Sequence, residues 1–313
     1  MSAIRIVTII VLTLILVAIF SYFLLTYLLY FITLRKGAWI GKYVKKVFHE
    51  NEDEYKINPA WWDLQNVQKF QIENDGLKLS GFYIKNPNVN TNKLAIILHG
   101  YYSDHRDMNI QAKLFLEKGF NIFCPDSRAH GESQGKTISM GYFEKNDLKK
   151  WIEFLTNKFG KDTQIAIFGW SMGAAIANLY CSGEVAPNVK CVISDCSYNN
   201  AYEEFKCMLK QRKLPSGLAM FLLNQGTKMY GEFFLKEVDV ESVIKFNKVP
   251  TLFIHGEKDS FVPSYMSEKL FNAKEKGYNK LVKFENAEHC MSYARDKEKY
   301  VNIISEFISS YFK

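Results

Sequence analysis

The pentapeptide Gly-Trp-Ser-Met-Gly contains the side chain of this sequence best suited to nucleophilic chemistry, the hydroxyl of Ser171. The apolar run before it predicts a buried strand, and the small residues after it predict a helix. Gly169 and Gly173 let such a strand and helix approach closely around a strained turn, which leaves the serine hydroxyl exposed. We therefore interpret Ser171 as a nucleophile; the alternative is a turn residue that caps the helix.

A serine hydroxyl is a poor nucleophile unless a base removes its proton, and a third group must orient that base. Both should follow at later strand ends, the acid before the histidine. Asp259 lies in the loop after the seventh predicted strand, and His289 lies in the loop after the eighth. Asp195, at the end of the sixth predicted strand, is the alternative acid. The neighbouring carboxylates are predicted to be solvated: Glu257, Glu285 and Glu288.

Two backbone N–H groups should bind the oxyanion that forms when the serine attacks a carbonyl. One should belong to Met172, the residue after the nucleophile. The other should come from the loop after the third predicted strand, which ends in His99-Gly100, so that Tyr101 is the expected donor. The alternative interpretation of His-Gly is an ordinary strand ending.

The remaining histidines and the six cysteines are weaker candidates for chemistry. His130 lies in a predicted turn and His255 at a strand end, while His49 and His105 are predicted to lie on the surface. No pair of histidines has the spacing of metal ligands, so we expect neither a metal nor an organic cofactor. The cysteines form no Cys-x-x-Cys pair, and we expect buried free thiols in a reducing compartment.

The elements that must position these residues alternate along the chain. Residues 67–84 predict two strands joined by a tight turn at Asp75-Gly76. Six short apolar strands then alternate with helices, which predicts an eight-stranded, mostly parallel sheet covered by helices on both faces. Reactive groups in such a fold gather outside the carboxyl ends of the strands. Residues 198–247 interrupt the alternation with helical, apolar sequence, which we expect to form a cap over that edge.

Five segments together closely resemble the α/β-hydrolase superfamily: HGYYSDHRDM, PDSRAHGESQGKTISMGYFEKNDL, GWSMGAA, HGEKDSFVP and AEHC. The resemblance covers about Val67 to the C-terminus and is nearest to the serine-aminopeptidase-like hydrolases that Gram-positive bacteria carry on a single N-terminal membrane helix. It implies the α/β-hydrolase fold. Ala129 departs from the family pattern, because glycine is common at that position. The residues matched are the triad Ser171, Asp259 and His289 and the oxyanion donors Tyr101 and Met172.

The N-terminal segment, residues 1–36, predicts a membrane anchor. Ile6 to Leu34 contains no charged residue, glycine or proline, and about 20 apolar residues suffice for a helix to span a bilayer. A cleavable signal peptide is the alternative, but its apolar region would be shorter and would precede a small-residue cleavage site. Residues 37–66 are predicted to form a basic, amphipathic juxtamembrane linker, lying along the lipid headgroups or docked onto the hydrolase domain at 67–313.

The net charge of +7 is not gathered into a basic stripe across the domain, and the acidic stretch HENEDEY follows the linker, so nucleic acid is not expected as a partner. Only Arg5 precedes the apolar segment, whereas five basic residues follow it: Arg35, Lys36, Lys42, Lys45 and Lys46. This excess of positive charge after the segment favours a catalytic domain in the cytoplasm. The extracytoplasmic side is the alternative, since such relatives are often described as cell-surface hydrolases.

Taken together, these patterns predict a membrane-anchored serine hydrolase that cleaves a carboxylic ester or thioester of a small-molecule acyl substrate through an acyl-enzyme. An acyltransferase or a peptidase on the same fold is the alternative among enzymes. A catalytically silent interaction module tethered to the membrane lipid bilayer is the alternative from another class. Neither the acyl group nor the oligomeric state follows from the sequence, because one fold and one triad serve many substrates.

Overall fold

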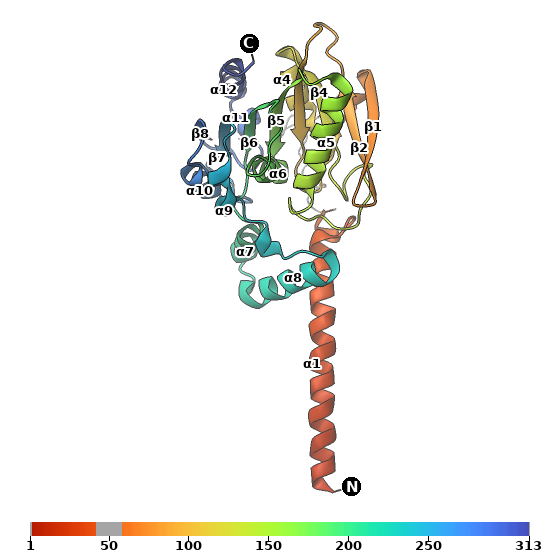
Figure 1. Cartoon of the computed structure of the whole chain (residues 1–313). Coiled ribbons are helices and arrows are strands. Elements are labelled where there is room, and N and C mark those ends of the chain that lie inside the picture. Colours follow the sequence, from red (N-terminus) through yellow and green to blue (C-terminus); the bar gives the residue numbers. More distant parts are fainter. Residues whose placement is uncertain (1, 42–57, 313) are drawn as a thin grey trace.

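The computed structural model describes residues 2–41 and 58–312. Its centre is an eight-stranded sheet in the order β1-β2-β4-β3-β5-β6-β7-β8 (Figure 1). This arrangement confirms the predicted α/β-hydrolase fold. The strands are β1 Val67–Asn74, β2 Leu77–Ile84, β3 Lys93–Leu98, β4 Asn121–Pro125, β5 Gln164–Trp170, β6 Val189–Asp195, β7 Thr251–Gly256 and β8 Asn279–Phe284.

The first two strands form the predicted hairpin. Asp75 and Gly76 connect them with φ angles of 51° and 70°, the left-handed backbone that a two-residue hairpin turn requires at both positions. β2 also pairs antiparallel with β4, whereas every later neighbour in the sheet is parallel. The carboxyl ends of β3 and β5 to β8 therefore meet at one edge, where reactive groups collect in this type of sheet.

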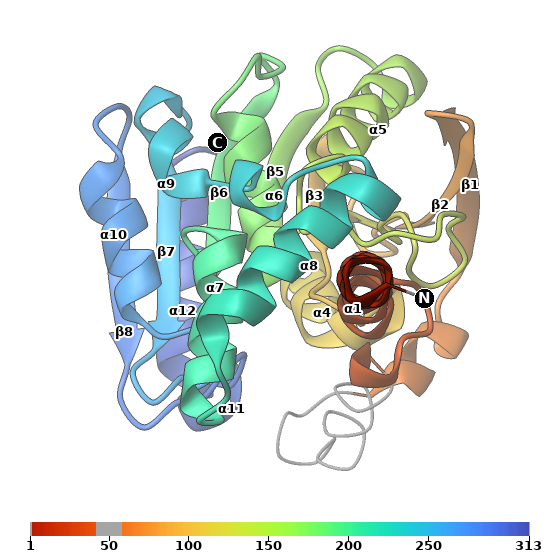
Figure 2. The ribbon, with the colours of Figure 1, turned by 90° about the horizontal axis from the view of Figure 1, so that it is seen from below.

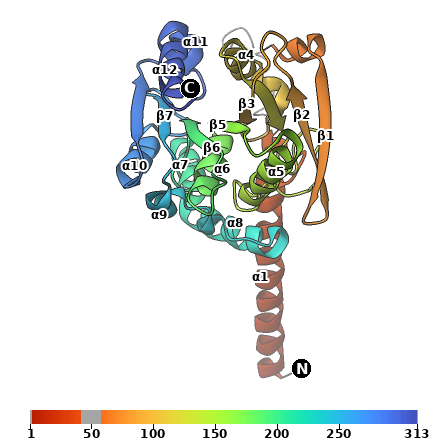
Figure 3. The same ribbon diagram turned by 45° about the horizontal axis from the view of Figure 1, so that its top comes forward.

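Helices cover both faces because the parallel strands are apolar on both sides. In β3, Leu94 and Ile96 belong to one core cluster and Ala95 and Ile97 to the other, as the two-residue period of a strand dictates. Helices α5 Glu144–Phe159, α6 Met172–Cys181 and α10 Tyr265–Ala273 pack on the first face. Helices α4 Asn109–Glu117 and α12 Lys297–Ser309 pack on the second (Figure 3).

The segment between β6 and β7 is helical, as its composition predicts. It contains α7 Ala201–Gln211, α8 Ser216–Gly231 and the short α9 Val240–Val243. Asn200 caps α7, since its side chain accepts hydrogen bonds from the backbone N–H groups of Tyr202 and Glu203. Figure 1 shows α7 and α8 on the side of the sheet from which the long N-terminal helix extends.

The N-terminal helix α1, Ala3–Leu34, is long and apolar enough to cross a membrane, although a signal sequence would meet the same criterion. Its first two thirds project away from the domain with exposed apolar side chains. Its end is different: Thr26, Tyr30, Thr33 and Leu34 are buried against the domain. Most of the predicted amphipathic linker helix falls on residues 42–57, outside the described residues.

Candidate active site

Ser171 lies at the turn between β5 and α6 with a φ of 55°, a left-handed conformation that is strained for a residue with a side chain. The two glycines explain how the turn is packed. A Cβ on Gly169 would lie 2.4 Å from the Gly173 carbonyl, and one on Gly173 would lie 2.2 Å from the Leu98 carbonyl oxygen. Both positions therefore require glycine, so that the strand and helix can hold the serine at the edge of the sheet.

Three predicted site residues form a continuous hydrogen-bonded chain. The Nε2 atom of His289 lies 3.0 Å from Ser171 Oγ, and its Nδ1 atom lies 2.6 Å from Asp259 Oδ2. Because a carboxylate only accepts, Nδ1 carries the proton and Nε2 is left to accept from the serine hydroxyl. All three side chains are buried, although they come from three different loops of the same sheet edge.

Asp259 is held by more donors than the sequence revealed. Its Oδ1 atom accepts the backbone N–H groups of Phe261 and Val262, at 2.9 and 2.8 Å. His255 donates from Nε2 to Val262 O at 2.8 Å and lies 3.2 Å from Asp259 Oδ2. Burial alone would raise the pKa of Asp259, but His289 and His255 outweigh it and lower the pKa to about 2. The acid is therefore ionised at neutral pH.

The pKa of His289, the proposed base, shifts in the opposite direction from that of Asp259. Burial lowers the pKa of His289, but the charge of Asp259 outweighs burial and raises that pKa well above its ordinary value. Asp195, the alternative acid, makes no hydrogen bond to His289 in the described part of the chain: its Oδ2 atom accepts from the Tyr300 hydroxyl at 2.7 Å. Glu257, Glu285 and Glu288 are exposed, as predicted.

The loop after β3 passes directly beside Ser171. A Cβ on Gly100 would lie 3.5 Å from Ser171 Cβ, so the peptide that carries the Tyr101 N–H adjoins the serine. The Met172 N–H belongs to the first turn of α6, where backbone donors have no partner within the helix. The residues that carry both predicted oxyanion donors thus lie next to Ser171, and their role as donors stays a prediction.

His130 shapes the same loop, which the sequence pattern did not indicate. Its Nε2 atom accepts the Tyr102 N–H at 3.1 Å, while Nδ1 donates to Arg128 O at 2.9 Å. Burial and the neighbouring His99 lower the pKa of His130 to about 3, so this ring stays neutral and can accept. Ala129, beside it, has a φ of 62°, which explains why glycine is common there.

The prediction that His105 lies on the surface is wrong. Its ring is buried against Phe82, with ring centroids 3.5 Å apart, and its Nδ1 atom lies 2.9 Å from Asp126 Oδ1. Burial would raise the pKa of Asp126, but the hydrogen bond and charge of His105 lower it to about 2. No local sequence pattern indicates this pair, because its members come together only when β2, β4 and the loop after β3 pack. His49 lies outside the described residues.

Two cysteines adjoin the base. Cys196 follows β6 and Cys290 follows His289, and their sulfur atoms are 3.3 Å apart. Both sulfur atoms and a ring nitrogen of His289 lie within 4.8 Å of one another. Sulfur and imidazole are ligands for soft metal ions, but both nitrogens of His289 are already engaged by Asp259 and Ser171. The sulfur atoms of Cys196 and Cys290 are therefore the two ligands of this cluster that the contacts of His289 leave available. All six cysteines are free thiols.

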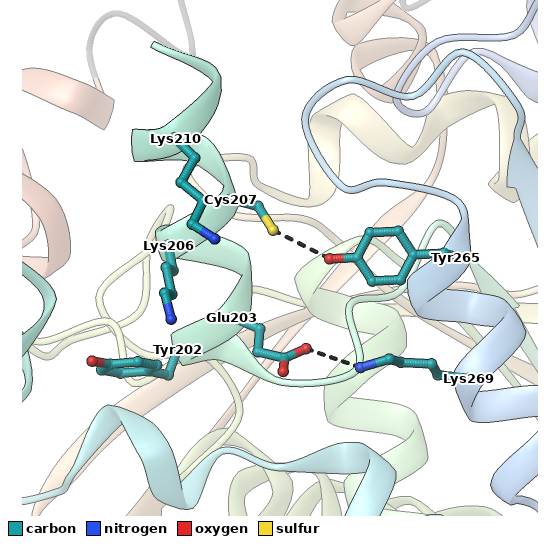
Figure 4. Close-up of a pocket in the computed structure, with 7 residues that line it drawn as sticks. All are labelled: Tyr202, Glu203, Lys206, Cys207, Lys210, Tyr265 and Lys269. Carbon is teal, nitrogen blue, oxygen red and sulfur yellow. Dashed lines mark hydrogen bonds and ion pairs between the residues drawn. The ribbon is translucent and has the colours of Figure 1, made fainter. Parts of the chain in front are cut away.

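The α7 helix covers the site from the cap side. Phe205 packs edge-on against Tyr101, with ring centroids 6.2 Å apart. Among the described residues, neither carboxyl oxygen of the buried Glu204 has a hydrogen-bond partner, and burial raises the pKa of its carboxyl group well above the ordinary value. A cavity of about 300 Å³ lies between α7 and α10, where Lys206 and Lys210 face the Glu203–Lys269 ion pair (Figure 4). None of the predicted site residues lines it.

Comparison with known proteins agrees with the observed fold. The α/β hydrolase fold family matches residues 94–224. The protein YqkD of Bacillus subtilis (strain 168) is 33% identical over 236 residues, which cover 75% of this chain and 76% of YqkD. The chain belongs to the α/β-hydrolase superfamily. Within it, the AB hydrolase superfamily protein YisY of the same strain is 23% identical over 69% of this chain and 91% of YisY.

Solved α/β hydrolases share the fold at lower identity. The esterase Pf2001 of Pyrococcus furiosus has a TM-score of 0.66 at 24% identity, over 81% of this chain and 96% of the esterase. Est1E of Butyrivibrio proteoclasticus, solved with ferulic acid bound, has a TM-score of 0.62 at 21% identity, over 77% of this chain and 98% of Est1E. The nearer likeness to serine-aminopeptidase-like hydrolases stays a prediction.

Proposed function

We propose that this protein is a serine hydrolase that cleaves carboxylic esters or thioesters through an acyl-enzyme. The observation that carries the proposal is the chain from Ser171 Oγ through His289 to Asp259, with bonds of 3.0 and 2.6 Å. The arrangement has the base within reach of the nucleophile and the acid on the other ring nitrogen, which is what nucleophilic acyl transfer needs.

In the proposed reaction, His289 takes the proton of Ser171 as the hydroxyl attacks the acyl carbonyl carbon. The Tyr101 and Met172 N–H groups hold the oxyanion, and His289 then protonates the leaving alcohol or thiol. Water, deprotonated by the same imidazole, releases the acid and restores the serine. Asp259 keeps the proton on Nδ1 and stabilises the imidazolium, which is why its low pKa favours the reaction.

We also propose that α1 anchors the enzyme in a membrane and is not removed as a signal peptide. Leu34 is fully buried, and its carbonyl accepts the Ile138 N–H at 2.7 Å. The Tyr102 hydroxyl lies 2.8 Å from the carbonyl oxygen of Thr33, in the same helix. Cleavage would take these contacts away from the loop that carries Tyr101, so the end of α1 is part of the folded domain.

The side of the membrane follows from charge alone. The Lys/Arg bias after the apolar segment supports a cytoplasmic hydrolase domain. Cysteines introduced at exposed positions of the domain should resist an impermeant thiol reagent in intact cells and react after permeabilisation. Reaction without permeabilisation would place the domain outside.

Esters are the favoured substrates because the fold neighbour Pf2001 is described as an esterase and because ester cleavage requires nothing beyond the triad and its oxyanion donors. The test uses the full chain in detergent and a series of p-nitrophenyl esters of increasing acyl length. Acids released in the presence of added alcohols identify a hydrolase, whereas new esters identify an acyltransferase.

A fluorophosphonate probe tests the nucleophile directly. Wild-type protein should be labelled, Ser171→Ala should not, and Ser182→Ala should be labelled fully. Ser182 is a matched control, because its hydroxyl bonds only to the Asn178 carbonyl at the other end of α6. Labelling that survives in Ser171→Ala overturns the assignment, and a wild-type protein that neither labels nor hydrolyses any ester is a silent module.

A further inference from the structure

The outer face of α8 is apolar and exposed, which is unusual for a helix of a soluble domain. Leu214 at its approach and Leu218, Phe221 and Met229 within it expose 50%, 67%, 51% and 40% of their surface. Leu218, Phe221 and Met229 follow one another at spacings of three and eight residues, which places them on one side of the helix. The opposite side packs into the domain through buried residues such as Leu223.

The α8 helix lies across α1 at a steep angle and contacts it closely. Figure 2 looks along α1 and shows α8 running across the view beside it. A Cβ on Gly226 would lie 2.5 Å from Thr26 O, so the two backbones nearly touch. The Tyr230 ring packs edge-on against Tyr27 at 5.2 Å, and its hydroxyl lies 3.4 Å from Phe23 O. The crossing point is therefore Phe23 to Tyr30.

The length of α1 below this crossing matches a bilayer. Ala3 to Tyr22 is about 20 residues, which rise about 30 Å, the thickness of the hydrocarbon core. If that part of α1 fills the core, the crossing falls at the lipid–water boundary. Tyr27 and Tyr230 then lie where aromatic residues of membrane proteins concentrate.

The charges around α8 fit the same boundary. Lys210, Arg212 and Lys213, at the end of α7, are exposed immediately before Leu214. Lys228 is exposed next to Met229. Basic side chains beside an apolar helix face are typical of segments that lie on anionic headgroups with their apolar side chains in the acyl boundary.

We infer that the outer face of α8 rests on the bilayer that α1 spans and thereby holds the substrate site directly above the lipid surface. The inference rests on the membrane anchoring proposed above. The lipid boundary explains both the exposed apolar face and its position level with the end of the exposed part of α1. A second copy of the chain would explain the first alone.

This placement also sets the substrate class. The carboxyl edge of the sheet faces the cap, and α7 with Phe205 lies over Tyr101. The helices of the cap therefore lie between the proposed active site and the lipid. An ester with a long acyl chain can reach such a site from the bilayer without crossing water, so amphiphilic acyl esters are the expected substrates.

Photocrosslinking of the full chain in nanodiscs of mixed zwitterionic and anionic phospholipid tests the contact. The photoreactive residue p-benzoylphenylalanine is placed in turn at positions 221, 14 and 278. Leu14 is 63% exposed on the exposed part of α1, and Tyr278 is 54% exposed before β8, at the opposite edge of the sheet. We expect phospholipid adducts at 221 and 14 and none at 278.

Each other pattern overturns the inference in a distinguishable way. Adducts at 14 but not at 221 would show that α1 spans the membrane while α8 does not contact lipid. The absence of adducts at both positions would contradict the membrane anchor as well. Crosslinks from 221 to a second protein chain make the face an interface between copies. None of these outcomes depends on hydrolase activity, so the proposed chemistry is tested separately.

A rate comparison tests the consequence. The double variant Leu218→Asp with Phe221→Asp should lower the rate on a long-chain ester embedded in the nanodisc by about tenfold or more, equivalent to about 1.4 kcal/mol. Its rate on a water-soluble short-chain ester should stay within about twofold of wild type, because this face is outside the reacting groups. Tyr278→Asp is the matched control. Equal losses on both esters would overturn delivery from the bilayer.

Discussion

Two histidine–aspartate pairs lie near the carboxyl edge of the same sheet, and they resemble each other closely. In both, the histidine Nδ1 atom bonds a buried carboxylate, at 2.9 Å for His105–Asp126 and 2.6 Å for His289–Asp259. In both, histidine contacts outweigh burial and lower the pKa of the aspartate to about 2. A histidine–aspartate pair by itself therefore does not identify a catalytic centre.

The two pairs differ in the other contacts that each histidine ring makes. The second nitrogen of His289 meets the hydroxyl of a serine held in a strained turn. The ring of His105 stacks on Phe82 and meets the edge of Trp62 at 5.3 Å. One imidazole is therefore placed to exchange a proton, and the other ties β4 to the loop after β3.

The largest expected difference is between the two histidines. His289→Ala should lower kcat/KM of the folded protein for a soluble p-nitrophenyl ester by about 10⁵ to 10⁶-fold. His105→Ala should instead lower the free energy of unfolding by about 3 to 5 kcal/mol, because it leaves the buried Asp126 without its partner. Urea unfolding and ester assays on both variants make the comparison, which fails if His105→Ala lowers the rate of the folded protein as strongly.

The two aspartates should separate in the same way. Asp259→Asn should lower kcat by about 10⁴-fold, because the amide no longer holds the proton on Nδ1 of His289. Asp126→Asn should destabilise the fold while the folded fraction keeps its rate within a few-fold. Active-site titration with the fluorophosphonate probe gives the folded, competent fraction. Equal rate losses in both variants would mean that both pairs serve the reaction.

The thiols of Cys196 and Cys290 adjoin the base of the proposed catalytic pair. Alkylation of the half-buried Cys290 by N-ethylmaleimide should lower the rate by about 100-fold, since displacing His289 by about 1 Å has an effect of that size. Cys290→Ala should resist the reagent. Cys207→Ala, which removes the other half-buried thiol, should stay sensitive. Sensitivity that follows Cys207 instead would contradict this arrangement.

The two pairs should behave alike toward acid. Each aspartate has a pKa of about 2 when folded and about 3.8 when unfolded, so each stabilises the fold above about pH 4 by about 2 kcal/mol. That stabilisation is lost as the pH falls from about 4 to 2. Urea unfolding between pH 7 and pH 3 should show a smaller acid loss in Asp126→Asn and in Asp259→Asn than in wild type.

The pH dependence of kcat/KM should depend on the His289–Asp259 pair and not on the His105–Asp126 pair. Because Asp259 raises the pKa of His289, the acidic limb of kcat/KM should lie above the ordinary histidine value of about 6.5. Asp259→Asn should move the limb to lower pH, and Asp126→Asn should leave it in place. A flat profile from about pH 5 to 8 would contradict the role of His289 as base.

The smallest effect is expected at Ala129, beside the loop that His130 orders. Left-handed backbone costs a residue with a Cβ about 1 to 2 kcal/mol, whereas glycine loses about 0.5 to 1 kcal/mol of chain entropy on folding. Ala129→Gly should therefore stabilise the protein by at most about 1 kcal/mol, measured by urea unfolding, with no change in kcat. A clear loss of stability would contradict this explanation of the family glycine.

Much of the fold and of the proposed site could be predicted because the relevant signals are local. Gly169 and Gly173 report a strand and a helix that nearly touch, and the alternation of apolar runs reports the order of strands. Asp259 and His289 could be found since each follows its strand within a few residues. The residues that contact the triad are harder to predict from the sequence. His255 has the sequence context of an ordinary strand end, although its Nε2 atom lies 3.2 Å from Asp259 Oδ2.

The order of elements, the serine at the strand-to-helix turn and the long apolar helix can all be read from local sequence, because each depends on neighbours a few residues apart. The burial of His105 and the approach of His289 to Ser171 depend on segments distant in the chain, so they emerge only when the elements pack together. The same holds for α1. Its composition is apolar from Ile6 to Leu34, but only packing against α8 and the loop of Tyr101 and Tyr102 divides it into an exposed part and a part built into the domain.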